Sequence, residues 1–232
     1  MRTLYSDNDQ SNWTMTDTTT ENEPFLTPTE ARVLGCLMEK QRTTPDQYPL
    51  TVNALTTACN QKTARNPVMH LEIGDVGHTL MQLRDRGLVH ASFTGRTERY
   101  DHKLAGHFML NRRQQALLCV LLLRGPQTQG ELRTHAARLA DFPDLAAVNE
   151  TLHELAGHQP ALVRELPRTA GAREQRYAHL LCGEPVVEPQ QARPADVASA
   201  AEDEQGERID RLEAEVAALR ADLEALRERV ER

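Results

Sequence analysis

The sequence predicts a mainly α fold with small β-hairpins (α+β), built as two tandem winged-helix domains followed by a C-terminal coiled-coil helix. Three observations support this prediction. The phrase R-x-x-R-Y-x-H occurs at residues 96–102 and again at 173–179, 77 positions later. Each copy follows segments with helical periodicity, and a heptad repeat of apolar residues closes the chain. Similarity at one fixed offset indicates a duplicated structural unit.

The first helix has a clear beginning. Thr27 can cap it, Pro28 suits the first helical position, and Glu30 completes a capping box. Apolar residues then recur with the 3.6-residue period from Val33 onward. We expect this helix to end near Gln41.

Two more helices follow in the first copy. Thr51 can cap the second, and a third is expected from about residue 72 to 86. Gly87 suits the left-handed position that ends a helix. The segment between these two helices is polar and basic, with Lys62 and Arg65.

A hairpin closes the first copy, with strands expected at 88–93 and 97–102. Strand alternation places Tyr100 and His102 on one face and Arg99 on the other. We expect the Tyr and His side chains of both copies to pack against the helices. The arginines either pair with nearby carboxylates or contact phosphates. Three helices and a hairpin are typical of a winged helix.

The second copy repeats this order. Its expected elements are a helix capped by Asn111 and ended by Gly125, a helix from Thr128 to about Leu139, a helix capped by Asp144, and strands at 162–166 and 174–181.

The sequence therefore divides into five segments. They are a disordered N-terminal tail (1–25), two winged-helix domains (26–107 and 108–183), a flexible linker (184–207) and the coiled coil (208–232).

The heptad positions predict a homodimer through a parallel coil, because branched residues at a with leucine at d favour two strands. The core positions are Ile209, Leu212, Val216, Leu219, Leu223, Leu226 and Val230. The facing charges are opposite in all three pairs, Arg208–Glu213, Glu215–Arg220 and Asp222–Arg227. The alternative is a single solvated helix with internal ion pairs.

Two stretches resemble a known family. Residues 26–68 begin L-T-P-T-E-A-R-V-L-G-C-L-M-E-K, and residues 121–133 read L-L-L-R-G-P-Q-T-Q-G-E-L-R. Both resemble the YceH-like family of uncharacterised bacterial proteins. The second hairpin also resembles the family's P-G-x-R-E-x-R-Y-x-H-L, although Ala170 stands where that motif has proline. The resemblance covers residues 26–183 and implies tandem winged-helix domains, without implying a biochemical activity.

Charge is unevenly distributed along the chain. The net charge is -7, yet residues 26–183 hold 19 Lys and Arg against 15 Asp and Glu. A mildly basic core is compatible with nucleic-acid binding. No apolar run is long enough to span a membrane, and no secretory signal is visible. The four cysteines lack C-x-x-C spacing, so we expect reduced thiols and a cytoplasmic protein without membrane contact.

The third helix of each copy is a poor partner for DNA. The first begins with Glu72 and Asp75 and has no basic residue before Arg84, and the second carries Asp144 and Glu150. Phosphate contacts by Lys and Arg dominate DNA affinity. The nucleic-acid-binding candidates therefore lie in the wings and in one loop: Lys62, Arg65, Arg96, Arg99, Lys103, Arg164, Arg168, Arg173 and Arg176.

No catalytic or metal-binding pattern emerges. Nine histidines are scattered without zinc-motif spacing, and there is no phosphate-binding glycine loop or nucleophile elbow. We expect no enzymatic activity, cofactor or metal. The leading hypothesis is a dimeric DNA-binding or transcription-regulatory protein that contacts double-stranded DNA. The alternative is a protein-interaction scaffold that uses its winged helices without binding DNA.

Overall fold

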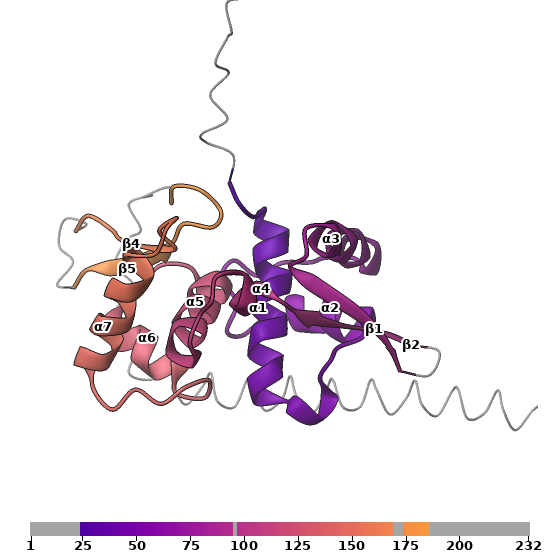
Figure 1. Cartoon of the computed structure of the whole chain (residues 1–232), viewed down its shortest axis with the longest axis horizontal. Coiled ribbons are helices and arrows are strands. Elements are labelled where there is room, and N and C mark those ends of the chain that lie inside the picture. The colour runs from indigo at the N-terminus through magenta and orange to yellow at the C-terminus, as the bar shows by residue number, and fades with distance from the viewer. Residues whose placement is uncertain (1–23, 95–96, 169–173, 186–232) are drawn as a thin grey trace, which may run out of the picture.

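The computed structural model describes residues 24–94, 97–168 and 174–185 (Figure 1). Nearly all of the predicted N-terminal tail, most of the linker and the whole coil lie outside these residues. The described chain is a mixed α+β fold with helices and small antiparallel sheets. Among its helices, none has the length and apolar character needed to cross a bilayer.

The first repeat contains the predicted order of helix, helix, helix and hairpin. Its elements are α1 (Pro28–Thr43), the short 3-10 helix η1 (Pro45–Gln47), α2 (Val52–Cys59), α3 (Ile73–Asp85), β1 (Val89–Thr94) and β2 (Thr97–His102). The predicted capping box of α1 is confirmed: Glu30 N donates to Thr27 Oγ1 at 3.2 Å and Thr27 N donates to Glu30 Oε2 at 2.7 Å. Gly87 adopts the expected left-handed conformation, with φ of +69°.

The second repeat has the same order and small differences. It contains α5 (Arg112–Arg124), β3 (Gln127–Thr128), α6 (Gln129–Ala136), α7 (Leu145–Ala156), β4 (Val163–Glu165) and β5 (Arg176–His179). The connecting helix α4 (Leu104–His107) was not predicted, because a single turn is too short to show periodicity. Helix α6 ends at Ala136 instead of near Leu139, where Leu139 N donates to Ala136 O and forms a turn.

The two repeats correspond at the offset of 77 at the start of the second helix and in the returning strand of the hairpin. Leu50 pairs with Tyr100 in an isolated antiparallel bridge, and Gln127 pairs with Tyr177 between β3 and β5. The segment before the second helix therefore adds a strand contact to the hairpin in both repeats. In each case the next residue, a threonine, caps that helix through its side chain.

The repeats share one hydrophobic core. Helices α1 and α5 lie side by side at the centre of the molecule, and the two hairpins lie at opposite ends (Figure 1). A Cβ atom on Gly35 would approach Leu123 Cδ2 to 2.9 Å, so the absent side chain permits this close contact. Cys119 Sγ also donates to Gly35 O at 3.4 Å across the same junction. The core thus fixes the two repeats against each other.

Candidate nucleic-acid interface

Arg65 is a structural residue, contrary to the sequence prediction that it contacts nucleic acid. Its side chain is fully buried, and its two Nη atoms bind both oxygens of Glu39 at 3.1 and 2.6 Å. The other donors reach three oxygens, those of Ala58, Ala64 and Gln61. All five N–H groups of the guanidinium are therefore used, and none is left for a phosphate.

A second buried arginine, Arg32, was missed by the sequence reasoning. It donates to Cys59 O at 3.1 Å and to Pro67 O at 2.6 Å, so it ties α1 to the loop after α2. The only sequence signal for its burial was its position beside apolar residues on a helix face. Lys62, in the same loop, is exposed and forms no ion pair or hydrogen bond with the described residues.

The first hairpin, formed by β1 and β2, has little uncommitted positive charge. Arg99 is half-buried and donates to Pro49 O at 2.9 Å, whereas Lys103 forms an ion pair with Asp101 at 2.6 Å. Arg84 lies 3.7 Å from Glu98 on the same hairpin. Arg96 lies outside the described residues. Lys103 and Arg84 thus have acidic partners on this hairpin, and Arg99 has a carbonyl partner.

The second hairpin, formed by β4 and β5, resembles the first in this respect. Arg176 donates to Pro126 O at 2.9 Å and lies 3.4 Å from Glu131, and Arg164 forms an ion pair with Glu184. Arg173 lies outside the described residues. Arg168 is exposed and has no partner within the part of the chain that the structure describes. Lys62 and Arg168 are therefore the two described candidates whose charge is uncommitted.

The exposed face of α3 is apolar and acidic. Ile73 and Met81 are 54% and 53% exposed, and Asp75 accepts a hydrogen bond from Glu72 N at the helix start. A Cβ atom added to Gly77 would meet no atom within 4 Å. In the second repeat, α7 likewise exposes Leu145, 47% accessible, together with Glu150 and Glu154.

The aromatic residues of the repeated phrase pack as predicted. Tyr100 and Tyr177 are half-buried against the core, and His102 is buried with its Nε2 3.0 Å from Gln41 Oε1. His179 is half-buried. Burial lowers the pKa of both histidines to about 4. These side chains therefore pack the hairpins against the core.

Comparison with known proteins identifies the family of the chain. The family described as a protein of unknown function, DUF480, matches residues 26–172. The chain belongs to this family. It is 50% identical over 206 residues to a UPF0502 protein of Mesorhizobium japonicum, covering 89% of this chain and 98% of that protein. It is 48% identical over 217 residues to a UPF0502 protein of Stenotrophomonas maltophilia, covering 92% and 100%, and 45% identical over 210 residues to one of Cellvibrio japonicus, covering 89% and 96%.

Membership of the DUF480 family confirms the predicted family resemblance. The family description states no activity, so the activity has to be inferred from the surface of the protein. The names of these relatives state no substrate or partner. The predicted dimerisation residues, which run from Ile209 to Val230, lie outside the described residues. The surface chemistry of α3, α7 and the two hairpins therefore supports the functional proposal.

Proposed function

We propose that the protein is an interaction scaffold whose third helices dock a partner protein through an apolar and acidic face. The observation that carries this proposal is the exposed side of α3. Ile73, Gly77 and Met81 are spaced four residues apart and so share one helix face. That face has no basic side chain before Arg84, which is paired with Glu98.

Gly77 lies in the middle of the exposed face of α3. Glycine inside a helix costs about 1 kcal/mol relative to alanine. No atom of the described chain lies close enough to Gly77 to clash with a Cβ atom at this position. Packing within the described chain therefore does not require a glycine here. The absence of a side chain leaves the helix surface flat between two exposed apolar residues, which allows the backbone of a partner to approach. Charge complementarity points to a partner segment with apolar and basic side chains.

Substitution of Gly77 separates this role from folding. We expect Gly77→Ala to raise the free energy of unfolding by about 1 kcal/mol and to weaken partner docking. Met81→Lys should abolish docking, whereas Met109→Lys, at a residue that is 87% exposed outside α3, should not. Photo-crosslinking from position 73, which lies on the same exposed face of α3, identifies the partner in living cells. Unchanged crosslinking in both α3 variants would contradict the proposal.

DNA binding is the second candidate function. It is favoured by the helix, helix, helix, hairpin order of each repeat and by the uncommitted charges of Lys62 and Arg168. Titration of the full chain with random-sequence duplex at low salt tests it. Non-specific binders reach a Kd of roughly 10⁻⁴–10⁻⁶ M, and combined Lys62→Gln and Arg168→Gln substitution should weaken such binding. No detectable binding at tens of micromolar would exclude this function.

We further propose that the C-terminal heptads join two copies of this cytoplasmic protein into a parallel dimer. The support is the apolar pattern and the three complementary charge pairs in the sequence. Deletion of residues 208–232 should halve the mass measured by light scattering. An unchanged mass would show that the coil does not set the oligomeric state.

A further inference from the structure

The outer edge of β1 has no strand beside it among the described residues. The sheet of the first repeat is formed by β1 and β2 at one end of the molecule (Figure 1). The other side of β2 is covered, because Leu50 N donates to Tyr100 O at 3.1 Å and Tyr100 N donates to Leu50 O at 2.8 Å. Strand β1 is therefore the open edge of this sheet.

The register of the hairpin shows which backbone groups face this open edge. Lys103 N donates to Leu88 O at 2.7 Å, so these two residues form a hydrogen-bonded pair beside the strand ends. Such pairs alternate along antiparallel strands, and the register of β1 with β2 is unbroken. Every second residue of β1 consequently directs its N–H and C=O away from β2. These residues are Val89, Ala91 and Phe93, and their backbone groups form no hydrogen bond within the part of the chain that the structure describes.

The edge also lacks the features that usually prevent exposed strands from pairing. Such edges in natural proteins are short or bulged, or carry charged residues or proline. Strand β1 reads V-H-A-S-F-T from Val89 to Thr94, without a bulge and without Asp, Glu, Lys, Arg or Pro. The side chain of Phe93 is 71% exposed near its end. The strand is therefore able to accept another strand along its whole length.

The equivalent edge of the second repeat is protected. Strand β4 has three residues and carries Arg164 and Glu165, both exposed. Glu165 pairs with Tyr177, the tyrosine of the second repeated phrase, and Ala91 pairs with Tyr100, the tyrosine of the first. Ala91 and Glu165 thus occupy the same position in the two sheets. The second repeat has a carboxylate where the first has a methyl group, so the edge of the first repeat is the one suited to pair with a further strand.

We propose that β1 pairs in antiparallel orientation with β1 of a second copy of the chain. The proposal rests on the dimer assigned above to the C-terminal heptads, which bring two copies together. A two-fold axis at Ala91 places this residue opposite its own counterpart and places Val89 opposite Phe93 of the second copy. The N–H and C=O groups that lack partners in the single chain then bond to each other across the axis.

The composition of the strand suits a second copy. The pairing brings no like charges together, since β1 has no Asp, Glu, Lys or Arg. Ala91 is the smallest residue of the strand, so two copies of it fit at the axis. A contact between two short strands is smaller than the ~1,200–2,000 Å² of a stable interface. The heptads compensate by raising the effective concentration to ~1 mM, and without them we expect a monomer.

Amide hydrogen exchange of the full chain, measured by nuclear magnetic resonance, tests the proposal. At an effective concentration of ~1 mM and a Kd of ~0.1 mM for the strand contact, exchange of the Ala91 and Phe93 amides should be about tenfold slower than at an open edge. Ala91→Glu places two like charges opposite each other at the axis and should remove this protection at Phe93. The Ser92 amide, which faces β2, should stay protected and so report a folded hairpin. Glu165→Ala is the matched control in the second repeat and should leave exchange at Phe93 unchanged.

Mixing of two chains shows whether the protecting strand belongs to another copy. An excess of unlabelled Ala91→Glu chain should speed exchange at Phe93 of the isotope-labelled parent chain, whereas an excess of unlabelled parent chain should not. An unchanged rate would assign the protection to a segment of the same chain and overturn the proposal. If Ala91→Glu also exposes the Ser92 amide, Phe93→Lys takes its place with the Ala91 amide as the readout, because the side chain of Phe93 is 71% exposed and its substitution leaves the hairpin folded.

Light scattering on the same samples separates the strand contact from the heptad dimer. A dimeric mass with rapid exchange at Ala91 and Phe93 overturns the strand contact alone and leaves the edge to a strand of a different protein. A monomeric mass with rapid exchange overturns both proposals. Protection that is lost in Ala91→Glu while the mass stays dimeric supports the strand contact.

Discussion

Arg99 and Arg176 make the same hydrogen bond in their respective repeats. Each donates from Nη1 to a proline carbonyl oxygen 50 residues earlier, Pro49 or Pro126, and each bond is 2.9 Å long. The contact joins the returning strand of the hairpin to the segment before the second helix. The second arginine of the repeated phrase therefore has a structural role in both copies. This role explains why the arginine recurs, and no bound ligand is needed to explain it.

This contact predicts a stability loss in both repeats. Arg99→Ala should lower the free energy of unfolding by about 1–2 kcal/mol, because a charge-assisted hydrogen bond to a half-buried carbonyl is lost. Arg176→Ala should cost about 1 kcal/mol or less, since Arg176 is exposed and solvent screens the bond. Urea denaturation measures both values.

Lys103→Ala is the matched control for the first hairpin. Its ion pair with Asp101 is half exposed, so the expected change is below about 0.5–1 kcal/mol. A loss in Lys103→Ala as large as that in Arg99→Ala would show that any cation of the hairpin has the same effect and would refute the specific role of the carbonyl contact.

The buried pair of Arg65 and Glu39 predicts a larger effect. Glu39→Gln leaves the buried guanidinium without its counter-charge and should destabilise the protein by about 3–5 kcal/mol. Glu98→Gln, which removes the half-buried partner of exposed Arg84, should cost less than about 1 kcal/mol. Urea midpoints of the two variants, measured together, test the difference. Similar midpoints would mean that the buried pair contributes little.

The same pair illustrates what sequence can and cannot predict. Helix starts depend on residues within one turn, so the caps at Thr27, Thr51 and Thr128 were predicted correctly. Arg65 lies in a polar, basic segment whose composition predicts exposure to solvent. Its partner Glu39 lies 26 residues earlier, on α1, and no local sequence pattern indicates a contact between residues that far apart.

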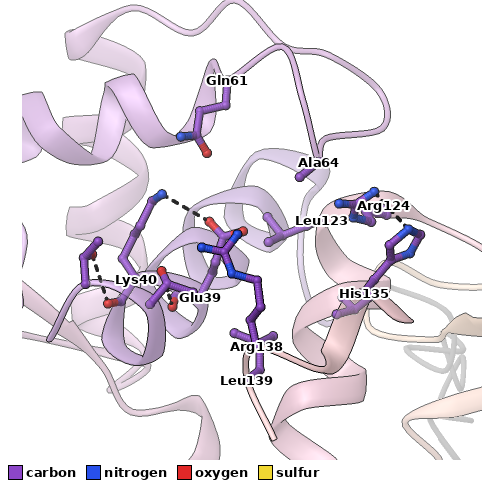
Figure 2. A pocket seen from close by; sticks show the side chains of 12 residues that line it. Glu39, Lys40, Gln61, Ala64, Leu123, Arg124, His135, Arg138 and Leu139 are labelled. Atoms are coloured by element: carbon purple, nitrogen blue, oxygen red, sulfur yellow. Dashed lines mark hydrogen bonds and ion pairs between the residues drawn. The ribbon is translucent and has the colours of Figure 1, made fainter. Parts of the chain in front are cut away.

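A cavity of about 50 Å³ at the junction of the two repeats, lined by residues of α1, α5 and α6 among others, was missed for the same reason (Figure 2). Lys40, Arg124 and Arg138 each lie near the end of a helix, where a basic residue also suits the helix dipole. Their convergence depends on the packing of α1 against α5, which Gly35 permits. The sequence indicated both helices without indicating that they would pack together.

The accessibility of the four thiols predicts which cysteine reacts first. Cys36, Cys59 and Cys119 are buried, whereas Cys182 is partly exposed. Burial also raises the pKa of Cys182 to about 11, so little thiolate is present at neutral pH. We expect a disulfide reagent to modify one thiol of the native protein first, at a rate that rises about tenfold per pH unit below that pKa. Cys182→Ser should remove this phase; its persistence would point to one of the buried thiols.

Stability should fall as the medium becomes acidic, in two steps. Burial lowers the pKa of His102 and His179 to about 4, below the ordinary value of 6.5. The unfolded chain therefore binds these protons first, and stability is lost as pH falls from about 6.5 toward 4. The loss can reach about 3 kcal/mol for His102 and less for half-buried His179. Glu39, whose pKa is about 2, adds a second loss below about 4.5.

The first step can be assigned by substitution. The buried Nδ1 of His102 has no hydrogen-bond partner among the described residues, so a proton there would lack an acceptor. Glutamine can keep a donor toward Gln41 and does not titrate. His102→Gln should therefore flatten the decline of the urea midpoint between pH 6.5 and 4. Exposed His78→Gln should retain the parent slope. An unchanged slope in His102→Gln would show that other groups cause the acid sensitivity.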